Sequence, residues 1–296
     1  MDEIAVAKAT LVRYKKKSQW KEIWLRMKRN KSAMFGLFVF TAILLAMICA
    51  DLIVPYEAAL EQDFTSRLIP PNSEHWFGTD PYGRDIFARI IHASRYSLLL
   101  GIVAVVVGIS IGSVLGSLAG FYGGWFDTAI MRVVDTILCI PFMLLVLAIV
   151  AALGPGLVNV LIALVVSMIP EYTRVIRSTI LTVVNNDYIL AARACGTPDF
   201  FIITKHVLPN AIGPVIVQAT MTVGLMIIYA AATSFLGMGI QPPTPEWGAM
   251  LSEGKDYMLL APYMVLFPGL AIMLTALSLN LLGDGLRDAL DPRLRD

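Results

Sequence analysis

Residues 136–170 read TILCIPFMLLVLAIVAALGPGLVNVLIALVVSMIP and contain no charged side chain. A helix needs about 20 apolar residues to cross the hydrocarbon core of a bilayer, so this stretch is too long for one crossing. Gly154-Pro155-Gly156 interrupts it with a turn signal that a helix does not run through. The stretch therefore predicts two membrane-spanning helices joined by a very short loop, in an all-α integral membrane protein.

Four further apolar stretches bring the predicted spans to six. They lie at 32–54, in the first two-thirds of 96–126, in the part of 207–245 before the proline-rich turn, and at 257–283. The chain is 57% hydrophobic and 15% charged, whereas soluble domains are about 45–50% apolar and about 25% charged. The first span follows 31 residues and is longer than the apolar region of a signal peptide, so we expect a retained anchor helix.

Lysine and arginine are distributed unevenly among the predicted loops. If the amino terminus is inside, eighteen of them fall in inside segments and five in outside segments. Because cytoplasmic segments carry an excess of these residues, both termini are predicted to be cytoplasmic. The predicted organisation is a basic cytoplasmic tail at 1–31, an anchor helix at 32–54, an extracytoplasmic loop at 55–95, a transmembrane domain at 96–284 and a cytoplasmic tail at 285–296.

The residue types that usually carry chemistry are scattered along the chain. A G-x-x-x-x-G-K-[ST] phosphate loop does not occur in the sequence. Ser110 sits in a G-x-S-x-G pattern, but that pattern requires a strand–turn–helix context and here falls inside an apolar span. The histidines and cysteines show no spacing typical of a metal site or a disulfide framework; they are His75, His92, His206, Cys49, Cys139 and Cys195. We therefore expect no enzymatic activity and no cofactor, metal or ATP site in this chain.

A glycine stripe marks the second span, at Gly108, Gly112, Gly116 and Gly120. Residues four apart share a helix face, and glycine lets another backbone come close, so the stripe predicts a packing face. The spans hold few carboxylates, which argues against an ion-coupled secondary transporter. An intramembrane protease would need a catalytic pair within the spans. The spans show only the discounted Ser110 pattern, which argues against this class too.

The longest predicted cytoplasmic loop covers 171–209. At its start, a helix leaves the membrane with one polar face, and a separate polar segment follows. That segment, 185–209, reads NNDYILAARACGTPDFFIITKHVLP. Asp187 is expected to cap a short helix that ends at Gly196, and Thr197 with Pro198 to start a second one that Pro209 stops. The sequence thus predicts a compact helix–turn–helix whose alanine face suits close approach to another protein.

The spacing of Ala191-Ala192, Gly196 and Leu208-Pro209 resembles the EAA loop of ABC-importer permeases, although Leu190 replaces the leading glutamate of that motif and His206 its usual isoleucine. Three further segments resemble the dipeptide/oligopeptide/nickel branch of that family. They read FGTDPYGRDI at 77–86, FLGMGIQPPTPEWG at 235–248 and NLLGDGLRDALDP at 280–292. The basic tail, single span and long outside loop resemble the C-type permease of this branch, and the likeness extends over about 28–295.

The resemblance implies a type I importer transmembrane domain in the cell (inner) membrane, with the bilayer as its solvent. It implies a heterodimeric pore shared with a paralogous permease subunit, two ATPase subunits on the cytoplasmic side, a solute-binding protein outside, and no nucleic-acid partner. The resemblance assigns contact with the ATPases to a coupling loop containing Asp187, Ala191, Ala192, Arg193, Gly196, Leu208 and Pro209.

Two outer segments are candidates for an outer gate or for contact with the binding protein, around Thr79-Asp80 and Glu246-Trp247; a folded loop capping the pore is an equal alternative. The expected substrates are dipeptides or oligopeptides, with nickel, a metallophore or glutathione as alternatives. The pore lining is left open, because polar span residues also make helix–helix hydrogen bonds. Such residues are Asn159, Gln218 and Thr222.

Overall fold

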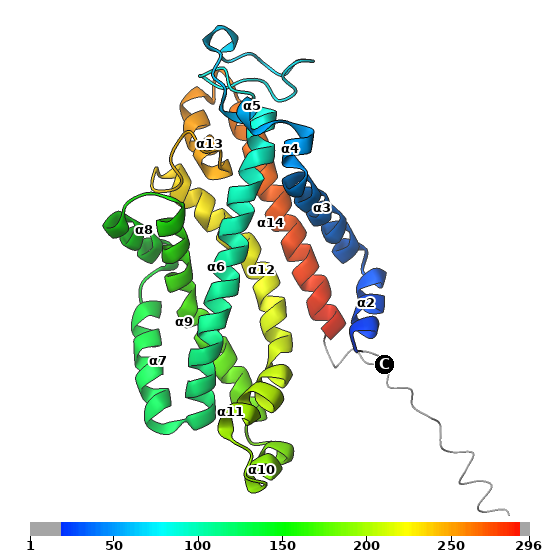
Figure 1. Ribbon diagram of the computed structural model, residues 1–296, viewed down its shortest axis with the longest axis vertical. Helices are drawn as coiled ribbons and strands as arrows, with labels where there is room; N and C mark the ends of the chain where they lie inside the picture. Colours follow the sequence, from blue (N-terminus) through cyan, green and yellow to red (C-terminus); the bar gives the residue numbers. More distant parts are fainter. Residues whose placement is uncertain (1–18, 291–296) are drawn as a thin grey trace, which may run out of the picture.

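The computed structural model describes residues 19–290, so residues 1–18 of the predicted tail at 1–31 and residues 291–296 of the predicted tail at 285–296 lie outside the described residues. This part of the chain is helical and contains no strand, which confirms the all-α prediction (Figure 1). The helices longer than five residues are α2 (Gln19–Arg29), α3 (Lys31–Ile48), α6 (Ile86–Tyr122), α7 (Gly124–Leu138), α8 (Phe142–Leu153), α9 (Leu157–Val183), α10 (Asp187–Ala194), α12 (Leu208–Phe235), α13 (Trp247–Gly254) and α14 (Tyr263–Leu290).

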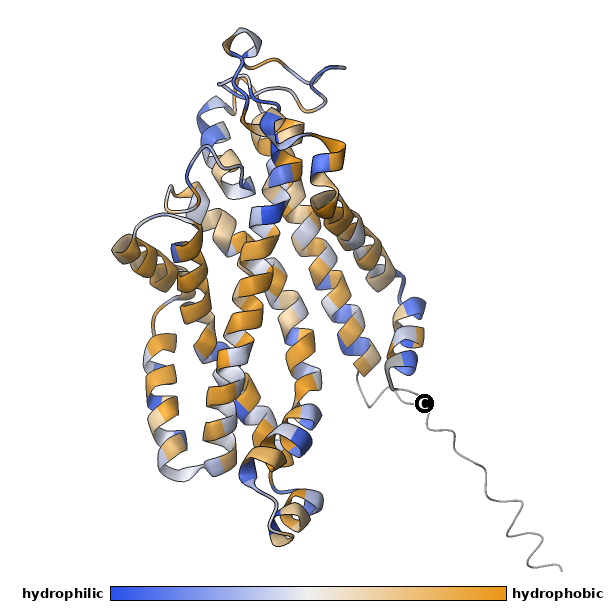
Figure 2. Ribbon diagram, in the orientation of Figure 1, coloured by the Kyte–Doolittle hydropathy of each residue, from blue (hydrophilic) through white to orange (hydrophobic). Residues whose placement is uncertain are grey.

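Five helical segments in the described chain are long and apolar enough to cross a membrane, and the bent pair α7 and α8 makes a sixth if it counts as one span. Figure 2 shows a broad hydrophobic belt over these helices, and more hydrophilic colour on α2 and α10. The short helices α4 (Ala50–Ile53) and α5 (Tyr56–Leu60) lie with α13 at one end of the bundle, and α10 with α11 (Asp199–Ile202) at the other (Figure 1).

The third span differs from the predicted one. The sequence predicts a helix from about residue 136 to the Gly154 turn, but α7 already begins at Gly124, and α8 turns away from it by 88°. The break falls at Pro141, whose fixed φ and missing N–H make it an ordinary start for a new helix. As a result, Asp127, Arg132 and Asp135 lie within a helix rather than in a loop.

The second span begins at Ile86, inside the predicted outer loop, because Asp85 caps it by accepting a hydrogen bond from the Ala88 N–H at 2.8 Å. The first span ends at Ile48, and a break at Cys49 separates it from α4. The fourth span runs through Pro170 to Val183 as one helix. The second and fourth spans are thus longer than predicted at their polar ends, where hydropathy gives little signal, and the first span is shorter than predicted.

The glycine stripe packs α6 against α9, as predicted. A Cβ atom built on Gly112 would lie 2.7 Å from the Cβ of Tyr172, and one on Gly116 would lie 2.8 Å from the carbonyl oxygen of Thr173. Ser110 belongs to the same helix, and its hydroxyl donates to the Val106 carbonyl at 2.7 Å. The two helices can approach this closely only because the side chains are absent.

Substituting Gly112 with valine should lower the free energy of unfolding by about 1–3 kcal/mol, since overpacking forces the two backbones apart. The measurement is thermal unfolding of the detergent-solubilised protein. Gly269→Ala is the control, because a Cβ there meets only Leu251 Cδ2 at 3.9 Å. Equal melting temperatures for Gly112→Val and the unmodified chain would contradict this packing.

Candidate functional site

The coupling element, defined as residues 187–209, forms one end of the bundle. It consists of α10, α11 and a π-helical turn at Ile203–Val207 that leads directly into α12. Three apolar side chains anchor it in the core, Ile189, Ile202 and Val207, each with an exposed fraction of 0%. A surface segment fixed in this way moves together with the spans to which it is anchored.

The turn between α10 and α11 is built around Gly196, which has φ +74°. Its N–H donates to the Arg193 carbonyl at 2.9 Å, and the Thr197 N–H donates to the Ala192 carbonyl at 3.1 Å. This is the Schellman arrangement, in which glycine adopts the left-handed region at little cost, and it confirms the predicted helix end.

The two helix starts are shifted by one residue from the prediction. Asn186 occupies the N-cap of α10 and Pro198 that of α11, and neither makes a side-chain cap hydrogen bond. Asp187 is therefore the first helical residue of α10 rather than its cap. At that position its carboxylate still complements the positive end of the helix dipole.

The prediction that Pro209 stops the second helix is wrong. The chain continues as helix from Asp199 to Phe235, and Pro209 lies in the first turn of α12. A proline clashes with the carbonyl four residues earlier, but the π turn widens the helix there, and the Leu208 N–H bonds to the Ile203 carbonyl instead. The Asn210 side chain donates to the His206 carbonyl at 2.6 Å and satisfies an acceptor in this turn.

Four large apolar side chains of the coupling element are exposed, among polar and charged ones. We define the docking surface as Tyr188, Leu190, Phe200 and Phe201, whose exposed fractions are 44%, 50%, 70% and 44%. Leu190 stands where the motif of the resembled family has glutamate, so this chain presents a hydrophobic side chain there. Exposed aromatic and aliphatic side chains on an anchored element are typical of surfaces that bind a protein partner.

The other predicted coupling residues surround the docking surface. Ala191, Arg193 and Pro209 are exposed, whereas Ala192 and Leu208 are half-buried. The Arg193 guanidinium lies over the Phe121 ring at 4.5 Å from its centroid and ties α10 to the end of α6. The alanines thus leave room around the larger apolar side chains.

The outer candidates Thr79, Asp80, Glu246 and Trp247 are all buried, with exposed fractions of 0–2%. The Glu246 carboxylate caps α13 by accepting from the Gly248 and Ala249 N–H groups at 2.9 and 2.8 Å. Burial raises the pKa of Glu246 above its usual value. In this conformation, these side chains contact other parts of their own chain.

Asp80 belongs to a buried ion network that the sequence alone did not reveal. Arg84 donates to Asp80 at 2.6 Å and to Glu253 at 2.8 Å. Arg89 also donates to Asp80, and reaches Glu253 at 2.7 Å. Both arginine side chains are about fully buried, with 2% and 1% exposed, so the network locks the outer loop and α6 to α13. In the sequence, the sign of this network is the cluster of charged residues at 80–89. That cluster does not indicate that the partner is Glu253 on α13.

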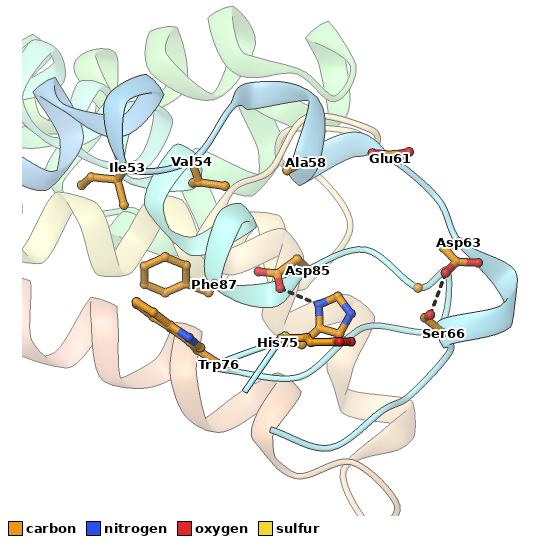
Figure 3. Close-up of a pocket in the computed structure, with 12 residues that line it drawn as sticks. Ile53, Val54, Ala58, Glu61, Asp63, Ser66, His75, Trp76, Asp85 and Phe87 are labelled. Atoms are coloured by element: carbon orange, nitrogen blue, oxygen red, sulfur yellow. Dashed lines mark hydrogen bonds and ion pairs between the residues drawn. The ribbon is translucent and has the colours of Figure 1, made fainter. Parts of the chain in front are cut away.

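A pocket of about 500 Å³ opens in the outer loop (Figure 3). His75 Nδ1 lies 2.8 Å from Asp85 Oδ2 in its wall, and Trp76 packs against Phe87 with ring centroids 5.0 Å apart. Since Asp85 also caps α6, the pocket wall helps to fix the outer end of that helix.

Two family descriptions match the sequence. Residues 112–296 match the binding-protein-dependent transport system inner membrane component, and residues 18–71 match the N-terminal TM domain of oligopeptide transport permease C. The dipeptide transport system permease protein DppC of Alkalihalophilus pseudofirmus is 46% identical over 94% of this chain and 91% of that protein. The glutathione transport system permease protein GsiD of Shigella flexneri is 46% identical over 94% of this chain and 92% of that protein.

Solved structures share the fold at lower identity. The inward-facing MetNI methionine ABC transporter aligns with a TM-score of 0.57 at 20% identity, over 70% of this chain and 98% of that one. An amino acid ABC transporter crystallised with histidines aligns with a TM-score of 0.54 at 16% identity, over 67% and 92% of the two chains. The chain therefore belongs to the binding-protein-dependent transport system inner membrane components, in the dipeptide and oligopeptide branch of the ABC importer permeases, which work in membrane complexes with ATPase subunits.

Proposed function

We propose that this permease forms half of a heterodimeric pore that imports dipeptides or short oligopeptides. A paralogous permease supplies the other half, and a solute-binding protein delivers substrate to the outer face. Two ATPase subunits dock on the cytoplasmic ends, one of them on the coupling element of this chain. The observation that carries the proposal is the docking surface, a group of exposed apolar side chains on an element anchored by fully buried side chains.

Alternating access explains why a rigid element is needed. ATP can bias the balance between two transporter states only through contacts that differ between those states. The coupling element is rigid enough to pass such contacts on to the spans. Ile202 and Val207 fix it in the core, and the π turn joins it to α12 without a loop. Movement of a docked ATPase would therefore pass directly to α12.

The proposed orientation places both termini and the coupling element in the cytoplasm. The lysine and arginine bias supports it, and α2 and α10 carry basic side chains at the same end of the bundle in Figure 1. The outer loop with its ion network then faces the binding protein. In this proposal, the buried pair Glu246 and Trp247 supports the outer surface rather than touching the partner.

The substrate class rests on the named relatives, since one is a dipeptide permease and another a glutathione permease. We expect purification of this chain with its neighbouring gene products to yield a complex containing ATPase subunits. In proteoliposomes, that complex with its binding protein should accumulate a labelled dipeptide only when ATP is present. Labelled glutathione and nickel are the competing substrates in the same assay. Absence of ATPase subunits, or ATP-independent uptake, would contradict the proposed function.

A further inference from the structure

The exposed face of α9 changes character halfway along the helix. Toward its outer end, the exposed side chains are Val158, Ile162 and Val166. In the two turns after Pro170 the exposed side chains are polar, at Glu171, Arg174 and Ser178. The sequence suggested that this polar stretch is the place where a helix leaves the membrane, yet the helix continues to Val183.

The polar stretch lies at membrane depth. With a rise of 1.5 Å per residue, Glu171 is about 21 Å from Leu157 and about 18 Å from the inner end of α9. A hydrocarbon core of about 30 Å that starts at Leu157, just after the outer turn, ends near Arg177. With the outer edge of the core placed at Leu157, Glu171 and Arg174 lie within it.

Neighbouring helices extend the polar stretch into a continuous surface. Arg174 donates to Asp135 of α7 at 2.6 Å, and Gln218 of α12 donates to Glu171 at 3.3 Å. We define the inner polar face as Asp135, Glu171, Arg174 and Gln218. A cavity of about 660 Å³ with Gln218 and Arg287 in its wall lies between the cytoplasmic halves of α12 and α14.

Lipid is an unsuitable neighbour for the inner polar face. Ionisable side chains within a span face protein or a water-filled passage, because desolvating them in hydrocarbon is unfavourable. The exposed face of the outer half of α14 shows the contrast, since it consists of apolar side chains, Leu266, Leu270, Met273 and Leu277. The inner polar face is thus built for an aqueous or polar neighbour.

The charges of this face are unequally paired. Arg174 and Asp135 neutralise each other, whereas Glu171 has the Gln218 amide as its hydrogen-bond partner and makes no ion pair within 4.0 Å among residues 19–290. The Glu171 carboxylate is therefore complementary in charge to an ammonium group that passes along this face. Peptides carry such a group at their amino terminus.

We propose that the inner polar face lines the cytoplasmic half of the substrate passage and that Glu171 holds the ammonium group of the substrate in transit. This inference rests on the proposed function as an importer of peptides. The apolar residues Val158, Ile162 and Val166 continue the same face toward the outer side, where they exclude water.

Thiol accessibility tests the passage. In the complete transporter with Cys49, Cys139 and Cys195 replaced by serine, Glu171→Cys is treated with a membrane-impermeant maleimide in inside-out vesicles. Leu277→Cys is the matched control, since each position lies fourteen residues from the outer end of its helix. We expect labelling of the first variant and not of the second. Equal absence of labelling would overturn the inference by indicating that protein or lipid covers the face.

Charge replacement tests the role of the carboxylate. Glu171→Gln keeps the shape of the side chain and should lower dipeptide uptake about 10-fold, the effect of losing one charge-assisted hydrogen bond, whereas Glu171→Asp should retain most of it. Both variants should still copurify with ATPase subunits. Wild-type uptake by Glu171→Gln would overturn the inference alone, whereas a complex without ATPase subunits would overturn the proposed function.

Discussion

Replacing Phe200 with aspartate should leave the permease folded in the membrane and uncouple uptake from ATP hydrolysis. The side chain is 70% exposed, so its loss removes little internal packing. At the centre of a protein interface, an aromatic anchor contributes about 2 kcal/mol or more, which corresponds to roughly 30-fold weaker association. A buried carboxylate at the same place would add a desolvation penalty.

The measurement is the affinity of the ATPase subunits for the solubilised permease, together with uptake in proteoliposomes. Leu259→Asp is the matched control, because Leu259 is 100% exposed and lies in the segment between α13 and α14; α13 is at the opposite end of the bundle from α10 in Figure 1. Gly196→Trp should also weaken docking: among the described residues nothing lies within 4 Å of a Cβ at that turn, so the indole stays on the surface, and the φ of +74° adds local strain to the turn. Normal affinity and uptake in both coupling variants would contradict the assignment.

Replacing Asp80 with asparagine should destabilise the outer half of the protein by about 3–5 kcal/mol, because two buried arginines would lose a counter-charge. Asp80 accepts from the Arg84 and Arg89 side chains and also from the Tyr82 N–H at 2.8 Å. The Glu253 carboxylate would then face both guanidinium groups alone.

Thermal unfolding in detergent and the yield of folded protein in membranes measure this effect. The control is Asp51→Asn, which breaks the exposed pair with Arg95, whose side-chain exposures are 60% and 37%, and should change stability by about 0–1 kcal/mol. An Asp80→Asn variant as stable as the Asp51→Asn variant would indicate that the network adds nothing to the fold.

Features that depend on the backbone preferences of single residues could be predicted from the sequence. The turn at Gly154-Pro155-Gly156, the left-handed Gly196 and the glycine stripe of α6 each depend on what one residue type permits in the backbone. Hydropathy likewise gave the all-α membrane architecture, because each span must satisfy its own backbone hydrogen bonds.

Features that depend on contacts between residues far apart in the sequence could not be predicted from it. The network of Asp80 joins residues from α6 and α13 that are far apart in sequence, and no local pattern specifies such a pairing. The helix through Pro209 required a π turn, which single-residue propensities do not encode. The sequence also did not show that α7 and α12 bring Asp135 and Gln218 beside the polar residues of α9.

Site-specific photo-cross-linking can show whether residues 187–209 contact an ATPase subunit. A photoreactive phenylalanine analogue replaces Phe200 in the assembled transporter, and the same analogue at Leu259 serves as the control. We predict an adduct between this permease and an ATPase subunit from position 200 and none from position 259. Cross-linking from position 200 only to lipid or to the paralogous permease would contradict the account.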